Sequence, residues 1–114
     1  MEIIGDDSDN ILRGGLFSDT IDGKAGNDRI FGLTGSDIIY GGLGNDIIYG
    51  GFGNDIIYGD EGSDLMYGGW GNDVLYLGAR DTAYGGPGGD IFYISSPQGG
   101  FPEGDVPSIL DFDS

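Results

Sequence analysis

Aspartate residues recur at a fixed spacing through most of this 114-residue chain. One stands at the same place in almost every nine-residue segment: Asp19, Asp28, Asp37, Asp46, Asp55, Asp64, Asp73 and, after one shorter segment, Asp81 and Asp90. A glycine-rich stretch precedes most of them. Ca²⁺ takes roughly six to eight oxygen ligands, which carboxylates and backbone carbonyls can supply. The spacing therefore predicts a row of calcium sites held by these aspartates, with the exception of Asp81 in the shorter segment.

The nine-residue period runs from residue 5 to residue 93 and contains ten copies. The clearest are GGLGNDIIY, GGFGNDIIY and GGWGNDVLY, which begin at residues 41, 50 and 68. One copy, LGARDTAY at residues 77–84, is one residue short. A fixed period is typical of proteins in which repeated units stack, and the last unit of such a stack needs a cap. We therefore divide the chain into a lead-in (residues 1–4), a stacked repeat (5–93) and a C-terminal cap (94–114).

Each copy divides into a six-residue turn and a three-residue strand. Glycine at the first, second and fourth positions permits positive φ angles and lets backbone carbonyls converge on a cation. The glycines predicted to contribute to the metal sites are Gly41, Gly42, Gly44, Gly50, Gly51, Gly53, Gly59, Gly62, Gly68, Gly69, Gly71, Gly85, Gly86 and Gly88. The last three positions carry mainly β-branched, aliphatic and aromatic residues, which favour a strand with side chains on alternate faces. The eighth position is predicted to form the core: Leu12, Ile21, Ile30, Ile39, Ile48, Ile57, Met66, Leu75, Ala83 and Phe92.

Two copies can make one circuit of strand, turn, strand and turn, which gives two parallel sheets with rungs about 4.8 Å apart. Turns on the same edge are then two copies apart, so aspartates separated by two copies should share an ion. Asp19 should be a weaker ligand because Phe17 occupies a glycine position in its turn. The first copy has Asn10 in place of the aspartate, and the short copy is expected to break the edge at Asp81. The best-formed pairs are Asp28–Asp46, Asp46–Asp64, Asp37–Asp55 and Asp55–Asp73, with Asp73–Asp90 as a fifth.

The copies resemble the G-G-x-G-x-D-x-U-x nonapeptide of RTX (repeats-in-toxin) proteins over about four fifths of the chain. Residues 108–113 also resemble the I-x-D-F-D stretch that commonly follows such repeats. The resemblance implies an all-β, right-handed parallel β-roll (a β-solenoid) that folds when it meets calcium. It also implies an extracellular bacterial protein exported by type I secretion. Residues 1–10 have neither the basic region nor the apolar region of an N-terminal secretory signal peptide, so export would need a different signal. Together with the aspartate pairs, it predicts about five to seven Ca²⁺ ions.

The composition argues against several classes of function. A formal net charge of −16 opposes binding to nucleic acid or to an anionic membrane surface. No apolar run approaches the roughly 18 residues of a membrane-spanning helix, so we do not expect membrane insertion. The chain has neither histidine nor cysteine, and its aspartates are nearly equivalent, so it offers no nucleophile with its base and we do not expect an enzyme. The same negative charge repels itself, so folding should be coupled to cation binding.

Two alternatives stay open. A glycine- and aspartate-rich chain can be a disordered linker, although a linker gives no reason for an Ile-class residue at every ninth position. Without calcium, disorder is our main expectation. The position-nine tyrosines and the aliphatic residues at position seven should face outward, either stacking between rungs or offering a surface for self-association or for a protein or carbohydrate partner. An adhesive module that uses these faces, or the turn residues Phe52 and Trp70, is the alternative function. The tyrosines are Tyr40, Tyr49, Tyr58, Tyr67, Tyr76, Tyr84 and Tyr93.

Overall fold

A computed structural model describes residues 1–95, 100–101 and 104–112. Within these ranges the chain forms strands and no helix, and so none that could cross a lipid bilayer. The strands are β1 (Glu2–Ile4), β2 (Ile11–Arg13), β3 (Thr20–Asp22), β4 (Arg29–Phe31), β5 (Ile38–Tyr40), β6 (Ile47–Tyr49), β7 (Ile56–Tyr58), β8 (Leu65–Tyr67), β9 (Val74–Leu77), β10 (Thr82–Gly86), β11 (Ile91–Ile94) and β12 (Ser108–Phe112).

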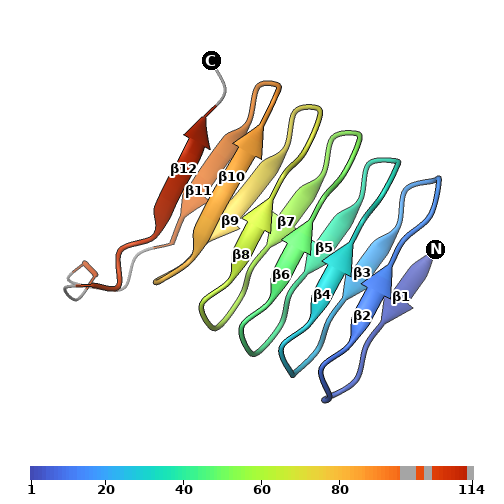
Figure 1. Ribbon diagram of the computed structural model, residues 1–114, viewed down its shortest axis with the longest axis horizontal. Helices are drawn as coiled ribbons and strands as arrows, with labels where there is room; N and C mark the ends of the chain where they lie inside the picture. Colours follow the sequence, from blue (N-terminus) through green and yellow to red (C-terminus); the bar gives the residue numbers. More distant parts are fainter. Residues whose placement is uncertain (96–99, 102–103, 113–114) are drawn as a thin grey trace.

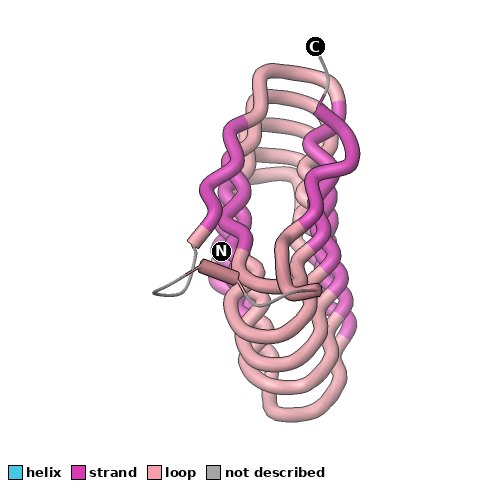
Figure 2. Tube along the Cα trace, turned by 90° about the vertical axis from the view of Figure 1, so that its left-hand side faces the viewer, coloured by secondary structure: helices cyan, strands magenta, loops and turns pink. Residues whose placement is uncertain are grey.

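The strands form two parallel sheets because the chain alternates between them. The odd sheet has the order β1-β3-β5-β7-β9-β11, and the even sheet has the order β12-β10-β8-β6-β4-β2. Every neighbouring pair is parallel. Figure 1 shows the successive rungs side by side, and Figure 2 shows the two walls of strands joined by turns along both edges. The predicted two-copy circuit is confirmed, and the fold is a β-solenoid of about five turns.

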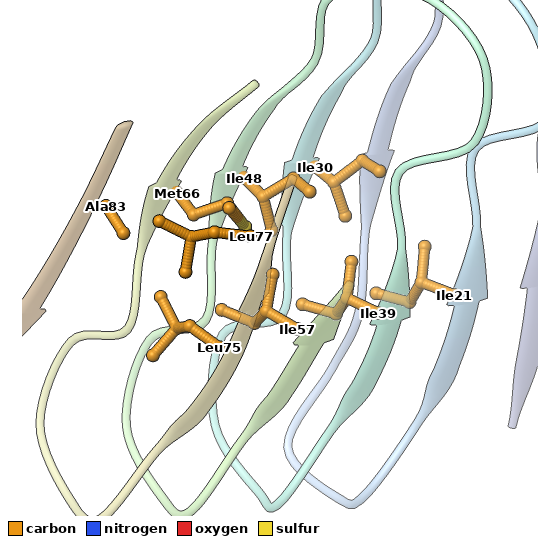
Figure 3. Packing of buried hydrophobic residues seen from close by; sticks show 9 residues of the cluster. All are labelled: Ile21, Ile30, Ile39, Ile48, Ile57, Met66, Leu75, Leu77 and Ala83. Atoms are coloured by element: carbon orange, nitrogen blue, oxygen red, sulfur yellow. The ribbon is translucent and has the colours of Figure 1, made fainter. Parts of the chain in front are cut away.

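The core is one column of side chains from each sheet, as the eighth position predicts. Ile21, Ile30, Ile39, Ile48, Ile57, Met66, Leu75 and Ala83 have no exposed surface (Figure 3). Leu12 and Phe92, near the two ends, are only partly buried. Because side chains alternate along a strand, a three-residue strand can place only its middle residue inside. A core this thin leaves much of the stability of the fold to the turns.

The short copy adds one core residue that sequence analysis missed. β9 continues to Leu77, which is 1% exposed and pairs with Ile94 of β11. The missing residue is taken from the turn, because Thr82 still pairs with Leu65 and Ala83 with Met66. A one-residue slip within the strand would turn the following side chains to the wrong face of the sheet. The short copy therefore keeps the strand register and has a turn that is one residue shorter.

Part of the predicted cap extends the even sheet. β12 pairs in parallel with β10, and the Ser108 N–H donates to the Asp81 carbonyl at 2.8 Å. Arg80, in the short turn, donates from Nε to Asp105 Oδ1 at 2.7 Å, and its N–H donates to the Asp105 carbonyl at 2.8 Å. The C-terminal segment is therefore held at the short copy by strand pairing and an ion pair. Residues 96–99, 102–103 and 113–114 of the predicted cap, including Asp113 of the I-x-D-F-D stretch, lie outside the described residues.

Aromatic rings stack from rung to rung along the outer face of each sheet. We call these rows the odd ladder (Tyr40, Tyr58, Tyr76 and Tyr93) and the even ladder (Phe31, Tyr49, Tyr67 and Tyr84). Neighbouring ring centroids lie 4.4–5.0 Å apart, with interplanar angles of 3–15°. Stacked aromatic pairs contribute about 0.5–1.5 kcal/mol each beyond the area they bury. The stacking prediction is confirmed, and a role of these faces in binding a partner stays a prediction.

Glycine serves two purposes in the turns. At the second and fourth positions it allows positive φ, as at Gly51 (93°) and Gly53 (102°). The prediction of positive φ at the first position is wrong, because no described first-position glycine has it. Three turns place a side chain at the second position with positive φ, at Lys24, Leu33 and Asp60, which costs about 1 kcal/mol or more each. First-position glycine must therefore be required for space.

Candidate functional site

The aspartates at position six form a hydrogen-bonded column along each edge of the roll. The Asp37 N–H donates to Asp55 Oδ1 at 2.9 Å, and the Asp55 N–H donates to Asp73 Oδ1 at 2.8 Å. The same bond links every successive pair. The first-edge column is Asn10, Asp28, Asp46, Asp64 and Asp81, and the second-edge column is Asp19, Asp37, Asp55, Asp73 and Asp90. The fold thus brings together the aspartates that lie two copies apart in the sequence.

The second carboxylate oxygen is left without a partner in the middle of both columns. The aspartates concerned are at most 2% exposed, and their Oδ2 atoms accept no hydrogen bond. A buried charged oxygen without a partner costs several kcal/mol, so each of these carboxylates must either bind a cation or take up a proton. The six aspartates are Asp28, Asp37, Asp46, Asp55, Asp64 and Asp73. They make up all four of the pairs that the sequence ranks first.

A second oxygen lies beside each of these carboxylate oxygens. A Cβ placed on Gly50 would lie 2.7 Å from Asp55 Oδ2 and 2.6 Å from the carbonyl oxygen of Gly68, in the next turn of that edge. At Gly41 the corresponding distances are 2.9 Å to Asp46 Oδ2 and 2.7 Å to the Gly59 carbonyl oxygen. Both atoms are acceptors, and both lie closer to the first-position glycine than a side chain would allow. Glycine at this position therefore lets the carboxylate and the carbonyl of the next turn approach each other.

The donor set fits calcium. Carboxylate and carbonyl oxygens are hard ligands, and the repeated turns can supply several of them to one ion. No group of three or more acidic, histidine or cysteine side chains that could hold a metal occurs among the described residues, so backbone carbonyls must complete each site. The Asp55 carboxylate and the Gly68 carbonyl would then hold one ion between two stacked turns.

The predicted glycine ligands differ in what their carbonyls contact. First-position carbonyls, such as those of Gly59 and Gly68, lie next to an aspartate Oδ2 atom. The second-position carbonyl of Gly51 instead accepts a hydrogen bond from the Trp70 N–H at 3.0 Å. First-position carbonyls are therefore the better candidates for metal ligands, and the Gly51 carbonyl ties one turn to the next.

Three turns in the columns are closed, by which we mean that a backbone N–H of the same turn donates a hydrogen bond to the side-chain oxygen of the column residue. The Gly15 N–H donates to Asp19 Oδ2 at 2.8 Å, and the Gly78 N–H donates to Asp81 Oδ2 at 2.7 Å. The amide oxygen of Asn10 accepts from the Asp6 N–H at 2.9 Å. In each of these turns the side-chain oxygen already has a hydrogen-bond donor and does not need a metal ion as its partner. That Asp19 is a weaker calcium ligand stays a prediction.

Asp81 requires a correction. The short copy was expected to break the edge there, but Asp81 Oδ1 still accepts from the Asp64 N–H at 2.8 Å, and Asp81 is 1% exposed. The column is therefore continuous. The turn has one residue fewer, which brings the Gly78 N–H within reach of Oδ2, so the change affects Oδ2 and not the stack.

Burial raises the pKa of the central aspartates. Desolvation is the largest cause at Asp55, whose pKa rises to about 8, and at Asp73, whose pKa rises to about 7; neighbouring column carboxylates raise both further. Burial likewise raises the pKa of Asp46 and Asp64. The metal-free turns thus hold protons strongly, and a divalent cation would have to displace them.

A second polar row was missed by sequence analysis. The side chain at position five accepts from the N–H of position five in the next turn: Asn45 Oδ1 from the Ser63 N–H and Asn54 Oδ1 from the Asn72 N–H, both at 2.8 Å. The signal was the recurrence of Asn and Ser before the aspartate. These bonds run in the opposite direction to the aspartate bonds, so each turn is held to its neighbour from both sides.

Replacing Gly50 by alanine is expected to destabilise the calcium-loaded roll by about 1–3 kcal/mol, the usual cost of forcing atoms into a filled space. The new Cβ would clash with both Asp55 Oδ2 and the Gly68 carbonyl oxygen. Gly15→Ala is the matched control, because a Cβ there meets nothing within 4 Å and its φ is not positive. Urea unfolding in excess calcium measures both. Equal losses of stability would show that the close approach at Gly50 has no special function.

Comparison with known families agrees with this geometry. A family model described as the RTX calcium-binding nonapeptide repeat (4 copies) matches residues 4–39, 22–57 and 49–79. The matches together span residues 4–79, which is 76 of the 114 residues. A comparison with curated protein sequences found no match. The chain belongs to the RTX calcium-binding nonapeptide repeat family, and it is a calcium-binding β-roll module.

Proposed function

We propose that this chain is a structural module that folds when several calcium ions bind between its stacked turns. The observation that carries the proposal is the row of buried Asp Oδ2 atoms without partners, each of which, except that of Asp64, lies beside a backbone carbonyl. We propose about five to seven ions. Four would lie between the pairs in which both aspartates have such an oxygen, and the remaining sites would involve the aspartates nearer the ends of the columns.

The ions would also compensate charge. The formal net charge of the chain is −16, and five divalent ions would reduce it to about −6. Much of the negative charge lies in the two columns, where backbone hydrogen bonds hold the carboxylates a single rung apart. Because the sites exist only when the turns are stacked, the binding free energy would contribute directly to folding.

Calcium is expected to fold the chain at a concentration at which magnesium does not. Mg²⁺ requires a tight octahedron at about 2.0–2.1 Å and gives up water reluctantly, whereas Ca²⁺ accepts larger, irregular sets of oxygens. Circular dichroism and isothermal calorimetry, with each ion titrated into metal-free protein, would measure the difference. Potassium chloride at matched ionic strength controls for charge screening. Equal folding by both divalent ions at equal concentration would contradict the proposed sites.

We further propose an extracellular, bacterial setting and no catalytic role. RTX repeats are typical of secreted bacterial proteins, and millimolar calcium is found outside cells. Export by a type I system follows from the same family resemblance. The chain has no histidine or cysteine, and its buried aspartates occupy equivalent positions along each column, which suits repeated binding more than catalysis.

A second candidate is an adhesive module that binds a protein or carbohydrate. Phe52 and Trp70 lie side by side on the second edge with ring centroids 6.2 Å apart, and they are 58% and 61% exposed. Exposed aromatic rings of this kind can bind sugar rings or apolar side chains. A screen for glycan and protein ligands, carried out in calcium, separates this candidate from a purely structural module.

A further inference from the structure

The two ladders hold tyrosine side chains in close contact at the surface. In the odd ladder the Tyr40–Tyr58, Tyr58–Tyr76 and Tyr76–Tyr93 centroids are 4.9, 4.4 and 5.0 Å apart. In the even ladder the Tyr49–Tyr67 and Tyr67–Tyr84 centroids are 4.8 and 4.9 Å apart. The rings are close to parallel throughout, with interplanar angles of at most 15°.

These rings are also accessible to reagents. Tyr40 and Tyr49 are each 37% exposed, Tyr76 is 36% exposed and Tyr93 is 51% exposed. Each ladder therefore combines exposure to an oxidant with a second phenol already in contact. Holding two reactants together in this way removes most of the entropic cost of their meeting.

We propose that the ladders are sites of oxidative cross-linking, at which stacked tyrosines on neighbouring rungs are joined as dityrosine. The oxidant is a haem peroxidase with hydrogen peroxide. Each of two phenols loses one electron and one proton, and the two phenoxyl radicals couple through ring carbons next to the oxygen-bearing carbon. The ring hydrogens at the new carbon–carbon bond then shift to the oxygens, which restores both phenols. The pair loses two hydrogen atoms, and the peroxide is reduced to two molecules of water.

The reaction would replace a reversible link with a permanent one. Rung-to-rung contact across the sheets depends on hydrogen bonds and stacking, and calcium acts only at the turns along the edges. A bond between Tyr58 and Tyr76 would join β7 to β9 in the middle of the odd sheet. Such a cross-link restricts the unfolded chain as a disulfide does, so the roll should resist loss of calcium.

The chain contains its own control. Phe31 stacks on Tyr49 with centroids 5.0 Å apart and an interplanar angle of 3°, so the geometry matches that of the tyrosine pairs. Phenylalanine has no phenol and forms no phenoxyl radical. This rung should stay unlinked although it is as well stacked as the others.

The test is peptide mapping by mass spectrometry after treatment of dilute protein with peroxidase and hydrogen peroxide. In calcium, with folding verified by circular dichroism, the expected links join only stacked neighbours, which lie 17 or 18 residues apart in the sequence. In EDTA, sequence neighbours such as Tyr49 and Tyr58 should couple more often, because shorter loops close at lower entropic cost. Links between sequence neighbours in folded protein, or predominantly intermolecular links, would overturn the proposal.

Tyr58→Phe provides the matched variant, because it keeps a stacked ring and removes the phenol. The Tyr40–Tyr58 and Tyr58–Tyr76 links should vanish, while the Tyr76–Tyr93 link and the even-ladder links persist. Cross-linked wild-type protein should keep its β-sheet spectrum after EDTA is added, and untreated protein should lose it. A cross-linked sample that unfolds in EDTA as readily as the untreated one would overturn the stabilising effect of the links.

Discussion

Removal of calcium with EDTA at pH 8 is expected to convert the roll almost completely to an unfolded chain. An ion present at ten times its dissociation constant stabilises the fold by about 1.4 kcal/mol, so five ions contribute about 7 kcal/mol. That is comparable to the whole stability of a typical domain, about 5–15 kcal/mol. The core is only one side chain deep in each sheet, and it cannot compensate for such a loss. Circular dichroism during a calcium titration should show cooperative folding near 10⁻⁴ to about 10⁻³ M.

The pH at which calcium is removed affects the outcome. Burial raises the folded-state pKa of Asp55 to about 8 and of Asp73 to about 7, above the unfolded value of 3.8. The stabilisation from these bound protons is fully present below the unfolded pKa and is lost as the pH rises through about 7 to 8. EDTA-treated protein should therefore keep more β structure at pH 5 than at pH 8. An unchanged spectrum in EDTA at pH 8 would show that the fold does not depend on calcium.

Asp55→Ala is expected to raise the calcium midpoint by about tenfold, equivalent to about 1.4 kcal/mol for one ion, and to abolish binding of about two ions. Asp55 is fully buried in the middle of the second-edge column, and its Oδ2 has no hydrogen-bond partner. It would share one ion with Asp37 and another with Asp73. In a stacked repeat each circuit is stabilised by its neighbours, so a central defect divides the array and should also lower its cooperativity. Isothermal calorimetry measures stoichiometry and midpoint together.

Two further variants separate the metal from the hydrogen bond. Asp55→Asn keeps an oxygen that can accept from the Asp37 N–H, and it removes the charge. It should lose calcium affinity nearly as much as the alanine variant. Asp19→Ala changes an aspartate whose Oδ2 is already bound to the Gly15 N–H near the end of the stack, so it should lose at most one ion with little change in midpoint. Equal effects of Asp55→Ala and Asp19→Ala would favour independent sites over shared ions.

The sequence was sufficient to predict the two-sheet parallel architecture, because the nine-residue period determines which residues stack. An inward residue at position eight and an aspartate at position six recur together, and only a two-copy circuit with parallel strands places both in columns. The four aspartate pairs that the sequence ranks first consist of residues whose Oδ2 atoms accept no hydrogen bond in the structure. Their binding of calcium stays a prediction. The family assignment follows from the same residues.

The closed turns could not be predicted, because they depend on distances within a single turn. Only the structure shows that the Gly78 N–H reaches Asp81 Oδ2 once the short copy loses a residue, and that Leu77 enters the core as a result. The role of first-position glycine was also misread, since composition does not distinguish a need for positive φ from a need for space. The sequence by itself therefore determined which residues form columns, because stacking the copies places residues at the same repeat position above one another. The tertiary structure decided which column oxygens are left without a hydrogen-bond partner, because that depends on whether a backbone N–H lies within about 3 Å of the oxygen.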